Sequence, residues 1–264
     1  MERPLAMVKL GGSVITRKEV EEEVNGEALD RLTWEVAEAW RSGLSLVVVH
    51  GGGSFPHPKA ERYRVNEGLE DGGETKLMGY SLTQDAAARL NRLVVSRLMR
   101  HGVPAAGLQP SAIMVAEGGS IKEVYVEALR AMLRLNLVPV LYGDAVMDLR
   151  KGFSIASAEM IIESLAPILK PKRIVVCVDV DGVYDKYPGG ALIERIWRGN
   201  IDRVKQGLGG SAGPDVTGGM LHKVMTLYSL AVKGYPSIII NGLKPNLLIK
   251  ALKGEPCPGT LIEG

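Results

Sequence analysis

Two glycine-rich turns follow apolar segments in the first quarter of the chain. The first, Lys9–Ser13, has the sequence Lys-Leu-Gly-Gly-Ser and follows the apolar run Leu5–Val8. The second, His50–His57, contains three consecutive glycines and follows Leu44–Val49. A strand, a glycine turn and a helix start together expose backbone N–H groups that attract anions. Two such turns, with lysines near one and a histidine after the other, indicate a site for two phosphate-bearing molecules and phosphoryl transfer as its chemistry.

Lysines near these turns are candidates for neutralising phosphate charge. Lys9 ends an apolar strand, where a lysine needs a polar partner. Lys18 follows a few residues later, and the alternative for it is a solvated surface lysine. Lys223 lies one turn inside a helix preceded by Asp215–Met220, whose glycines would let a phosphate approach. The spacing matches neither the P-loop nor the dinucleotide-binding motif.

Two histidines lie at the second turn and have different expected roles. His57 follows the triple glycine, so we expect it to donate to a substrate phosphate; the alternative is a histidine packed on the surface at a helix start. His50 ends the preceding strand, and we expect it to form a structural hydrogen bond.

Two aspartates follow apolar strands. Asp144 comes after Val138–Tyr142, at the strand end where α/β sheets bind ligands. We expect it to orient Lys9 and Lys18 by charge pairing, although aspartate is also common in turns. Asp179 follows the next long apolar run, and its Asp-Val-Asp-Gly sequence would by itself equally mark a turn.

The elements that position these residues alternate between strands and helices. The apolar runs are nearly continuous in Val, Ile and Leu, as in parallel strands covered on both faces, which predicts an α/β sandwich. Two hairpins interrupt the pattern, and a mobile loop is expected at Gly207–Pro214. The predicted strands are Leu5–Leu10, Leu44–His50, Pro104–Leu108, Val138–Tyr142, Arg173–Val178 and Ser237–Asn241. The predicted helices are Ala28–Ser42, Thr75–His101, Val124–Asn136, Ala158–Leu169, Gly218–Lys233 and Asn246–Lys253, and the hairpins pair Ile113–Ala116 with Ser120–Lys122 and Val146–Leu149 with Phe153–Ala156.

Composition limits the class of protein. The chain has 264 residues, 46% hydrophobic and 23% charged, which is enough for one large α/β domain. The net charge of +2 gives no support for a nucleic-acid partner. Two cysteines, Cys177 and Cys257, have no metal-binding spacing and exclude a disulfide framework. Without a signal peptide or an apolar stretch approaching 18 residues, we expect no membrane association and a cytoplasmic location.

Five separated motifs, in this order and spacing, resemble the amino acid kinase superfamily over nearly the whole chain. Two further segments, Leu82–Gln84 and Gln109–Ala112, together with the histidine after the glycine turn, resemble the isopentenyl phosphate kinases. The resemblance implies a single domain over residues 1–264, a three-layer αβα sandwich with a central, mostly parallel sheet. The five motifs are Lys9–Ser13, His50–Ser54, Gly143–Val146, Asp179–Tyr184 and Asp215–Lys223.

The same resemblance implies an activity and its reactants. It implies ATP-dependent phosphorylation of isopentenyl phosphate to isopentenyl diphosphate, with Mg²⁺. The amino-terminal lobe, about residues 1–170, would bind this substrate, and the carboxy-terminal lobe, about 171–264, would bind the nucleotide. A homodimer formed through helices of the amino-terminal half is also implied, and no protein residue is assigned as a metal ligand.

Roles of individual residues come from the matching motif positions. The resemblance implies that Lys9 and Lys18 bind the transferred phosphoryl group, that Asp144 organises these lysines, and that Gly52 and His57 bind the substrate phosphate. It places the start of the long helix, including Met78 and Tyr80, at the wall of a prenyl pocket; the alternative is that such apolar positions are simply core. The positions implied to lie along the nucleotide are Lys9, Gly11, Gly12, Ser13, Gly53, Asp179, Gly218 and Lys223.

The chain departs from the resembled family at two places. Pro56 stands where the family has glycine, and the proline ring fixes φ and removes one N–H donor. Ser157-Ala158-Glu159 replaces Ser-Gly-Asp, so Ala158 adds a methyl group where the backbone would approach the substrate, and Glu159 has a longer reach than aspartate.

Other functions remain open from the sequence. Fosfomycin kinase or another small-phosphate kinase of the superfamily would share the pattern. Acetylglutamate and uridylate kinases fit less well, because an acetylglutamate site should present an arginine to a carboxylate. A non-catalytic nucleotide-binding protein is the alternative of another class, and the presence of Lys9, Lys18, Asp144 and Lys223 together argues against it.

Overall fold

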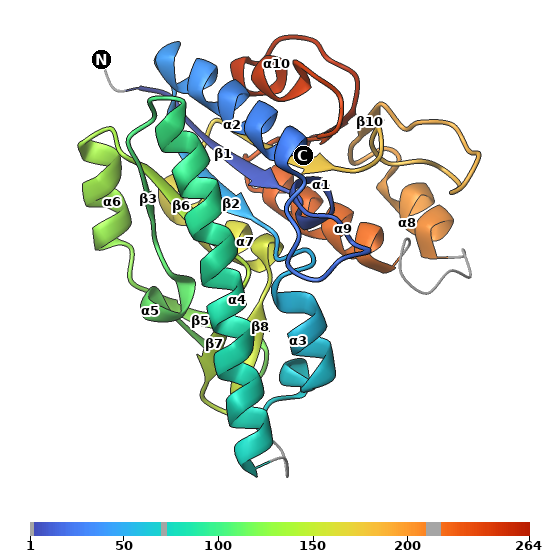
Figure 1. Cartoon of the computed structure of the whole chain (residues 1–264). Helices are drawn as coiled ribbons and strands as arrows, with labels where there is room; N and C mark the ends of the chain where they lie inside the picture. The colour runs from blue at the N-terminus through green and yellow to red at the C-terminus, as the bar shows by residue number, and fades with distance from the viewer. Residues whose placement is uncertain (1–2, 70–72, 210–217) are drawn as a thin grey trace.

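The computed structural model describes residues 3–69, 73–209 and 218–264. Its centre is an eight-stranded sheet in the order β10-β12-β11-β9-β1-β2-β6-β3 (Figure 1). All neighbouring strands run parallel except β11 and β12. The strands are β1 (Leu5–Leu10), β2 (Ser45–His50), β3 (Ala105–Gly107), β6 (Val138–Tyr142), β9 (Arg173–Val178), β10 (Arg195–Ile196), β11 (Ser237–Asn241) and β12 (Thr260–Ile262).

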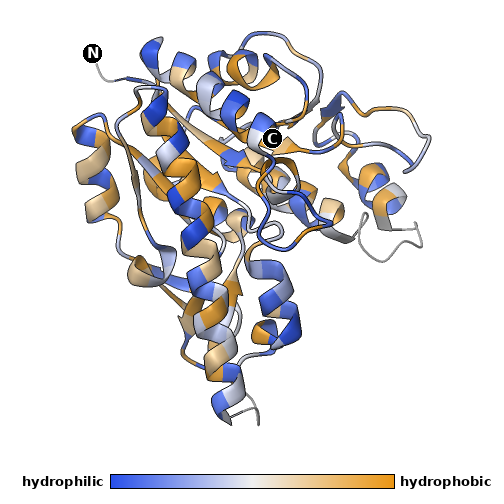
Figure 2. Ribbon diagram, in the orientation of Figure 1, coloured by the Kyte–Doolittle hydropathy of each residue, from blue (hydrophilic) through white to orange (hydrophobic). Residues whose placement is uncertain are grey.

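Helices cover both faces of this sheet. One layer contains α4, α2 and α10, with α2 in contact with both of the others, and the other layer contains α7, α8 and α9. Figure 2 shows apolar residues along the central strands and hydrophilic residues on the outer side of α2. The helices are α1 (Gly12–Ile15), α2 (Gly26–Arg41), α3 (Pro56–Arg62), α4 (Gly73–Arg100), α5 (Pro110–Ile113), α6 (Glu127–Arg134), α7 (Ala158–Leu169), α8 (Ile201–Gly209), α9 (Gly218–Val232) and α10 (Leu247–Lys253), with the short 3₁₀ helix η1 (Val65–Glu67).

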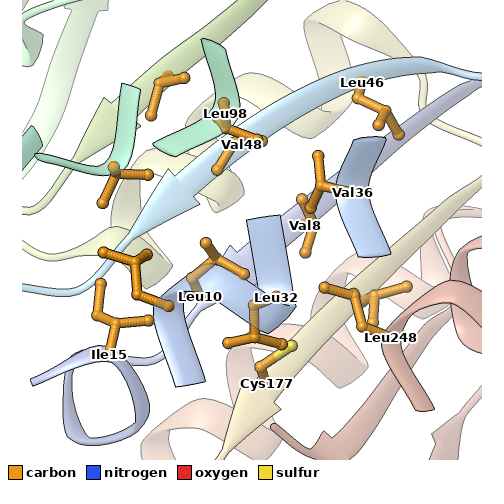
Figure 3. Close-up of a cluster of buried hydrophobic side chains, with 14 of the residues drawn as sticks. Val8, Leu10, Ile15, Leu32, Val36, Leu46, Val48, Leu98, Cys177 and Leu248 are labelled. Carbon is orange, nitrogen blue, oxygen red and sulfur yellow. The ribbon is translucent and has the colours of Figure 1, made fainter. Parts of the chain in front are cut away.

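Strand periodicity assigns each side chain of β1 to one of two cores. Ala6, Val8 and Leu10 pack with α2, α4 and α10, and part of this core is shown in Figure 3. Met7 packs on the opposite face with α7 and α9. Because successive side chains of a strand point to opposite faces, Lys9 faces the same layer as Met7. The alternation of side chains along β1 therefore places Lys9 on the face that α7 and α9 cover.

A smaller four-stranded sheet, in the order β5-β4-β7-β8, lies beside α3 and the first half of α4 (Figure 1). It combines the two predicted hairpins, which are joined by pairing of Ala116 with Asp148. The Asp148 carboxylate accepts N–H groups from both hairpin turns, at Gly118, Gly119, Arg150 and Lys151. Its strands are β4 (Met114–Glu117), β5 (Ser120–Val124), β7 (Asp144–Asp148) and β8 (Gly152–Ala156).

The fold confirms the expected αβα sandwich with a mostly parallel sheet. Two local predictions are corrected. The helix expected over Val124–Asn136 spans only Glu127–Arg134, because Val124 ends β5 and Asn136 adopts a φ of 58°.

The loop expected over Gly207–Pro214 is wrong in its first part, because α8 continues through Gly209. Ile201, Val204 and Leu208 recur at helical spacing and are buried, and this packing outweighs the low helix propensity of the glycines. Residues 210–214 lie outside the described part of the chain.

Among the described residues, no helix combines the length and apolar character needed to cross a membrane.

Candidate active site

The two glycine turns lie against each other at the carboxyl edge of the central sheet. Leu10 at the end of β1 pairs with His50 at the end of β2, so the turns that follow start side by side. A Cβ added to Gly12 would lie 2.4 Å from the backbone nitrogen of Gly53. The two turns can approach this closely only because both positions lack a side chain.

Thr16 connects these turns to the loop that carries Lys18. Its hydroxyl donates to the Gly12 carbonyl at 2.8 Å and accepts the Ser54 N–H at 3.0 Å. Gly53 has a φ of 55°, and a Cβ there would lie 2.1 Å from this hydroxyl. Gly11, Gly12, Ser13 and Gly53 are thus brought together, as the sequence predicts.

Lys9 contacts a carboxylate that the sequence analysis did not assign to it. Its ammonium pairs with Glu159 in the first turn of α7, and Lys223 on α9 approaches the same carboxylate oxygen at 3.8 Å. All three side chains are largely buried. Glu159 therefore lies between two cations from different elements.

Electrostatics favour the charged form of Glu159. Burial alone would raise its pKa, but Lys9 and Lys223 outweigh burial and lower it to about 2. Burial and the nearby Lys9 ammonium lower the pKa of Lys223. The carboxylate is fully ionised at neutral pH, and it holds two ammonium groups at the end of β1.

Lys18 forms a second ion pair at this edge. Its Nζ lies 3.1 Å from Asp179, which follows β9, and the Lys18 side chain is 65% exposed. Burial opposes ionisation of Asp179, but the hydrogen bond from Lys18 and a further one from Ser13 lower its pKa. Lys9, Lys18, Glu159, Asp179 and Lys223 are together called the lysine–carboxylate cluster below.

The expected pairing of Asp144 with Lys9 and Lys18 is not what the structure has. Asp144 begins β7, and its carboxylate accepts the N–H groups of Ser111 at 3.0 Å and of Ala145 at 2.9 Å. Burial raises its pKa to about 6. Within the described ranges, the carboxylates that pair with the lysines are Glu159 and Asp179 instead.

The second glycine turn brings Gly52 and His57 together. Pro56 is the first residue of α3, a position that suits proline because its N–H would have no partner within the helix. A Cβ on Gly52 would lie 2.3 Å from the Pro56 ring and 3.2 Å from Cδ2 of His57. Pro56 therefore fits the helix start without loss of a helical hydrogen bond.

The structure places the three other residues predicted to contact the acceptor, Tyr80, Met78 and Ala158, in different environments. Tyr80 packs on Phe153 with ring centroids 5.3 Å apart, in a small cluster with Val65 and Ala145. Met78 is 57% exposed, so it is not a core residue. The Ala158 side chain is buried in the core under α7, so its methyl group packs with the protein.

The Asp-Val-Thr segment at 215–217 lies outside the described residues, and α9 begins at Gly218. Gly218 and Lys223 are therefore on one helix, and Lys223 reaches the cluster.

A cavity of about 770 Å³ lies at the other edge of the sheet. It is lined by residues that start β9 and β11, including Arg173 and Ser237, and by Cys257. The lining contains none of the predicted site residues, so the cavity is separate from the lysine–carboxylate cluster.

The side chains near the site show whether the protein itself could hold Mg²⁺. In the described part of the chain, no three His, Cys, Asp or Glu side chains form a group that could bind a metal ion. Mg²⁺ commonly binds through substrate phosphates and waters with few protein ligands. This chain therefore fits Mg²⁺ that arrives with a nucleotide.

Comparisons with known proteins identify the family of the whole chain. The model of the amino acid kinase family matches residues 4–241. The isopentenyl phosphate kinase of Methanothermobacter thermautotrophicus is 39% identical and covers 98% of this chain and 99% of its own. The isopentenyl phosphate kinase of Methanocaldococcus jannaschii is 35% identical, and the match covers 95% of this chain and 96% of that protein. A crystal structure of an isopentenyl phosphate kinase superposes with a TM-score of 0.85 at 36% identity, covering 98% of this chain and 99% of its own.

The sheet order, the paired glycine turns and these matches over nearly the full length point to one family. The chain belongs to the amino acid kinase family, in the branch that contains the isopentenyl phosphate kinases.

Proposed function

We propose that this protein transfers the γ-phosphoryl group of ATP to isopentenyl phosphate and forms isopentenyl diphosphate for isoprenoid biosynthesis. The observation that carries the proposal is the convergence of Lys9, Lys18 and Lys223 beside two facing glycine turns. This arrangement suits two polyanions bound side by side. The similarity to isopentenyl phosphate kinases supports the identity of the acceptor.

The chemistry requires charge neutralisation more than proton abstraction. A phosphate monoester has a second pKa of about 6 and is largely dianionic at neutral pH, so it can attack ATP without a general base. The protein must bring two anions into line and stabilise the charge on the transferred group. Lysines and backbone N–H groups provide this stabilisation.

On the nucleotide side, the N–H groups of Gly12 and Ser13 and the turn at Gly53 would contact the ATP phosphates. Gly11 would lie along these phosphates without donating, because its N–H donates to the Cys177 carbonyl at 3.1 Å. Lys9 and Lys223 would bind the β- and γ-phosphates, and Glu159 would keep both ammonium groups at the required position. Lys18 would stabilise the transferred group after leaving its pair with Asp179, because its exposed side chain can reorient. Mg²⁺ would neutralise further phosphate charge, bound to ATP.

On the acceptor side, Gly52 and His57 would bind the phosphate of isopentenyl phosphate. Tyr80 and Phe153 would contact the apolar tail, since they form part of an apolar cluster beside this turn. Asp144 would act on the acceptor side indirectly, by fixing the backbone of Ser111, whose N–H its carboxylate accepts.

The larger organisation is also a proposal. We place the whole chain in one domain, with an acceptor-binding lobe up to about residue 170 and a nucleotide-binding lobe after it. Pairing of β1 with β9 supports one domain, because the sheet continues across that boundary. We further propose a homodimer formed through α2 and α4, on which Trp34 and Leu93 are exposed apolar residues.

The test is a coupled ADP-release assay with isopentenyl phosphate, ATP and Mg²⁺ on the parent and on His57→Ala. His101→Ala, at the far end of α4, is the matched control. We expect turnover in the parent and the control and a large loss in His57→Ala. Turnover with fosfomycin but none with isopentenyl phosphate would contradict the proposed acceptor, and ATP binding without any turnover would contradict a kinase.

A further inference from the structure

His50 and Asn91 form a buried polar pair directly behind the acceptor-side glycine turn. His50 ends β2, has no exposed surface and stacks on Tyr142 with ring centroids 5.6 Å apart. Its Nδ1 lies 3.0 Å from the carbonyl oxygen of Gly51, and its Nε2 lies 3.2 Å from Nδ2 of Asn91 on α4. None of the roles proposed above uses this pair.

The hydrogen-bond partners determine where the ring proton lies. The Gly51 carbonyl can only accept, so Nδ1 must carry the proton. Asn91 Nδ2 also donates to the Val140 carbonyl at 3.2 Å, which fixes the amide nitrogen on this side. Nε2 of His50 therefore accepts from Asn91, and the ring is held as the neutral Nδ1–H tautomer.

Two further observations support this arrangement. Burial lowers the pKa of His50 to about 4, which keeps the ring neutral at physiological pH. A Cβ on Gly107 would lie 2.4 Å from Asn91 Oδ1, so glycine at that position leaves room for the amide.

The hydrogen bond to Gly51 sets the direction of the next peptide group. In a planar trans peptide the C=O and N–H bonds point in opposite directions. When the Gly51 oxygen is held towards His50, the Gly52 N–H points away from His50. Within the described residues the Gly52 N–H donates to no protein acceptor, and Gly52 lies against His57.

We propose that Asn91 and His50 are positioning residues that aim the Gly52 N–H at the phosphate of the acceptor. Neither side chain touches the substrate. Asn91 fixes the ring tautomer, His50 fixes the Gly51–Gly52 peptide, and that peptide presents a donor beside His57. This inference rests on the proposed function, since it names how the acceptor phosphate is recognised.

Two carboxamide substitutions separate the two hydrogen bonds of the ring. In His50→Asn the short amide can place a donor near the position of Nδ1 and keep the bond to Gly51. In His50→Gln the longer amide reaches the position of Nε2 and loses the bond to Gly51. Both variants lose the ring and its stacking on Tyr142, so each is the matched control for the other.

Steady-state kinetics of both variants give the first readout. We expect the KM for isopentenyl phosphate of His50→Gln to exceed that of His50→Asn by about tenfold or more, as for a lost hydrogen bond to a charged group. The KM for ATP should agree between them within about threefold, since it reports the other turn. Equal KM values for the acceptor in both variants, or a parallel rise in the KM for ATP, would overturn the proposal.

A second readout needs neither turnover nor a variant. Nitrogen-15 NMR of the parent should show His50 as the Nδ1–H tautomer, and the Nε2–H tautomer would overturn the proposal even if the enzyme is active. If the parent fails to phosphorylate isopentenyl phosphate, the proposed acceptor is wrong. In that case calorimetric titration of inorganic phosphate tests the positioning role, with weaker binding to His50→Gln than to His50→Asn as the supporting result and equal binding as the contrary one.

Discussion

Lys18 differs from the other cluster lysines because most of its side chain is exposed and its partner Asp179 lies on another strand end. An exposed ion pair contributes little to stability, so loss of Lys18 should not unfold the protein. We expect Lys18→Ala to lower kcat by about 10²–10³-fold, the size seen when a donor to the transition state is removed. The KM values should change much less.

The neighbouring Arg17 gives a matched control for that substitution. Its side chain is 61% exposed and pairs with Glu23, so Arg17→Ala removes a cation from the same loop without removing the Lys18 contact. ADP release should be nearly normal in Arg17→Ala. Equal losses in the two variants, or equal effects of Lys18→Ala on kcat and KM, would contradict a role for Lys18 in the transition state.

Glu159, unlike Lys18, is largely buried, and it lies between two ammonium groups. Glu159→Gln removes the carboxylate that Lys9 and Lys223 share. Breaking a buried pair in this way typically costs about 3–5 kcal/mol, so we expect a clear loss in the free energy of unfolding measured by denaturant titration, together with a fall in kcat.

Glu159→Asp keeps the charge and shortens the side chain by one methylene, so it should recover part of both losses. A Glu159→Gln variant as stable and as active as the parent would show that the two lysines do not depend on this carboxylate.

At the scale of elements, the entry into α3 depends on glycine at position 52. A Cβ there would meet the Pro56 ring at 2.3 Å, and the first turn of α3 carries His57. We therefore expect Gly52→Ala to displace the start of α3, to raise the KM for isopentenyl phosphate several-fold and to leave the KM for ATP nearly unchanged.

Gly26→Ala is the control for that change. Gly26 is the first residue of α2, and a Cβ there would meet nothing within 4 Å. Thermal denaturation and both KM values should stay close to those of the parent. A larger kinetic effect at Gly26 than at Gly52 would contradict the steric argument.

The elements also show what a sequence can predict. Long apolar strands such as Val138–Tyr142 and Arg173–Val178 are predicted to the residue, because burial on both faces leaves a continuous pattern. The two-residue strand β10 and the three-residue strand β12 carry no such pattern. They form because β12 pairs with β10 on one side and with β11 on the other. Long-range pairing, which local sequence does not encode, decides these short elements.

The same distinction applies to the site. Lys9, Lys18 and Lys223 are candidates from the sequence because each lies near a glycine-rich turn. Asp179 could equally mark a turn, and only the resemblance assigns it to the site. Glu159 is 150 residues from Lys9, so its pairing depends on how α7 packs. One signal was available: the periodicity of β1 places Lys9 on the face of Met7, opposite Val8. That periodicity indicates that the partner of Lys9 lies on the same face of the sheet as Met7, which is the face that α7 covers.

At the scale of the whole molecule, two buried groups should give opposite pH dependences of stability. Burial raises the pKa of Asp144 from 3.8 to about 6, so the folded state binds the extra proton and stability falls as pH rises through this range. Burial lowers the pKa of His50 from 6.5 to about 4, so the unfolded state binds the extra proton and stability rises with pH. Each shift corresponds to about 3 kcal/mol.

Between pH 4.5 and 6 these two contributions should largely cancel. Glu159 adds little in this window, because its contribution to stability is lost only below the pKa of 4.5 that it has in the unfolded chain. We expect the parent to show a nearly flat free energy of unfolding in denaturant titrations across that window. Asp144→Asn should remove the falling contribution, so that stability rises with pH, whereas His50→Asn should remove the rising one, so that stability falls. If both variants shifted the slope in the same direction, the two groups could not be titrating in opposite senses, and at least one of them would be solvated in the folded protein.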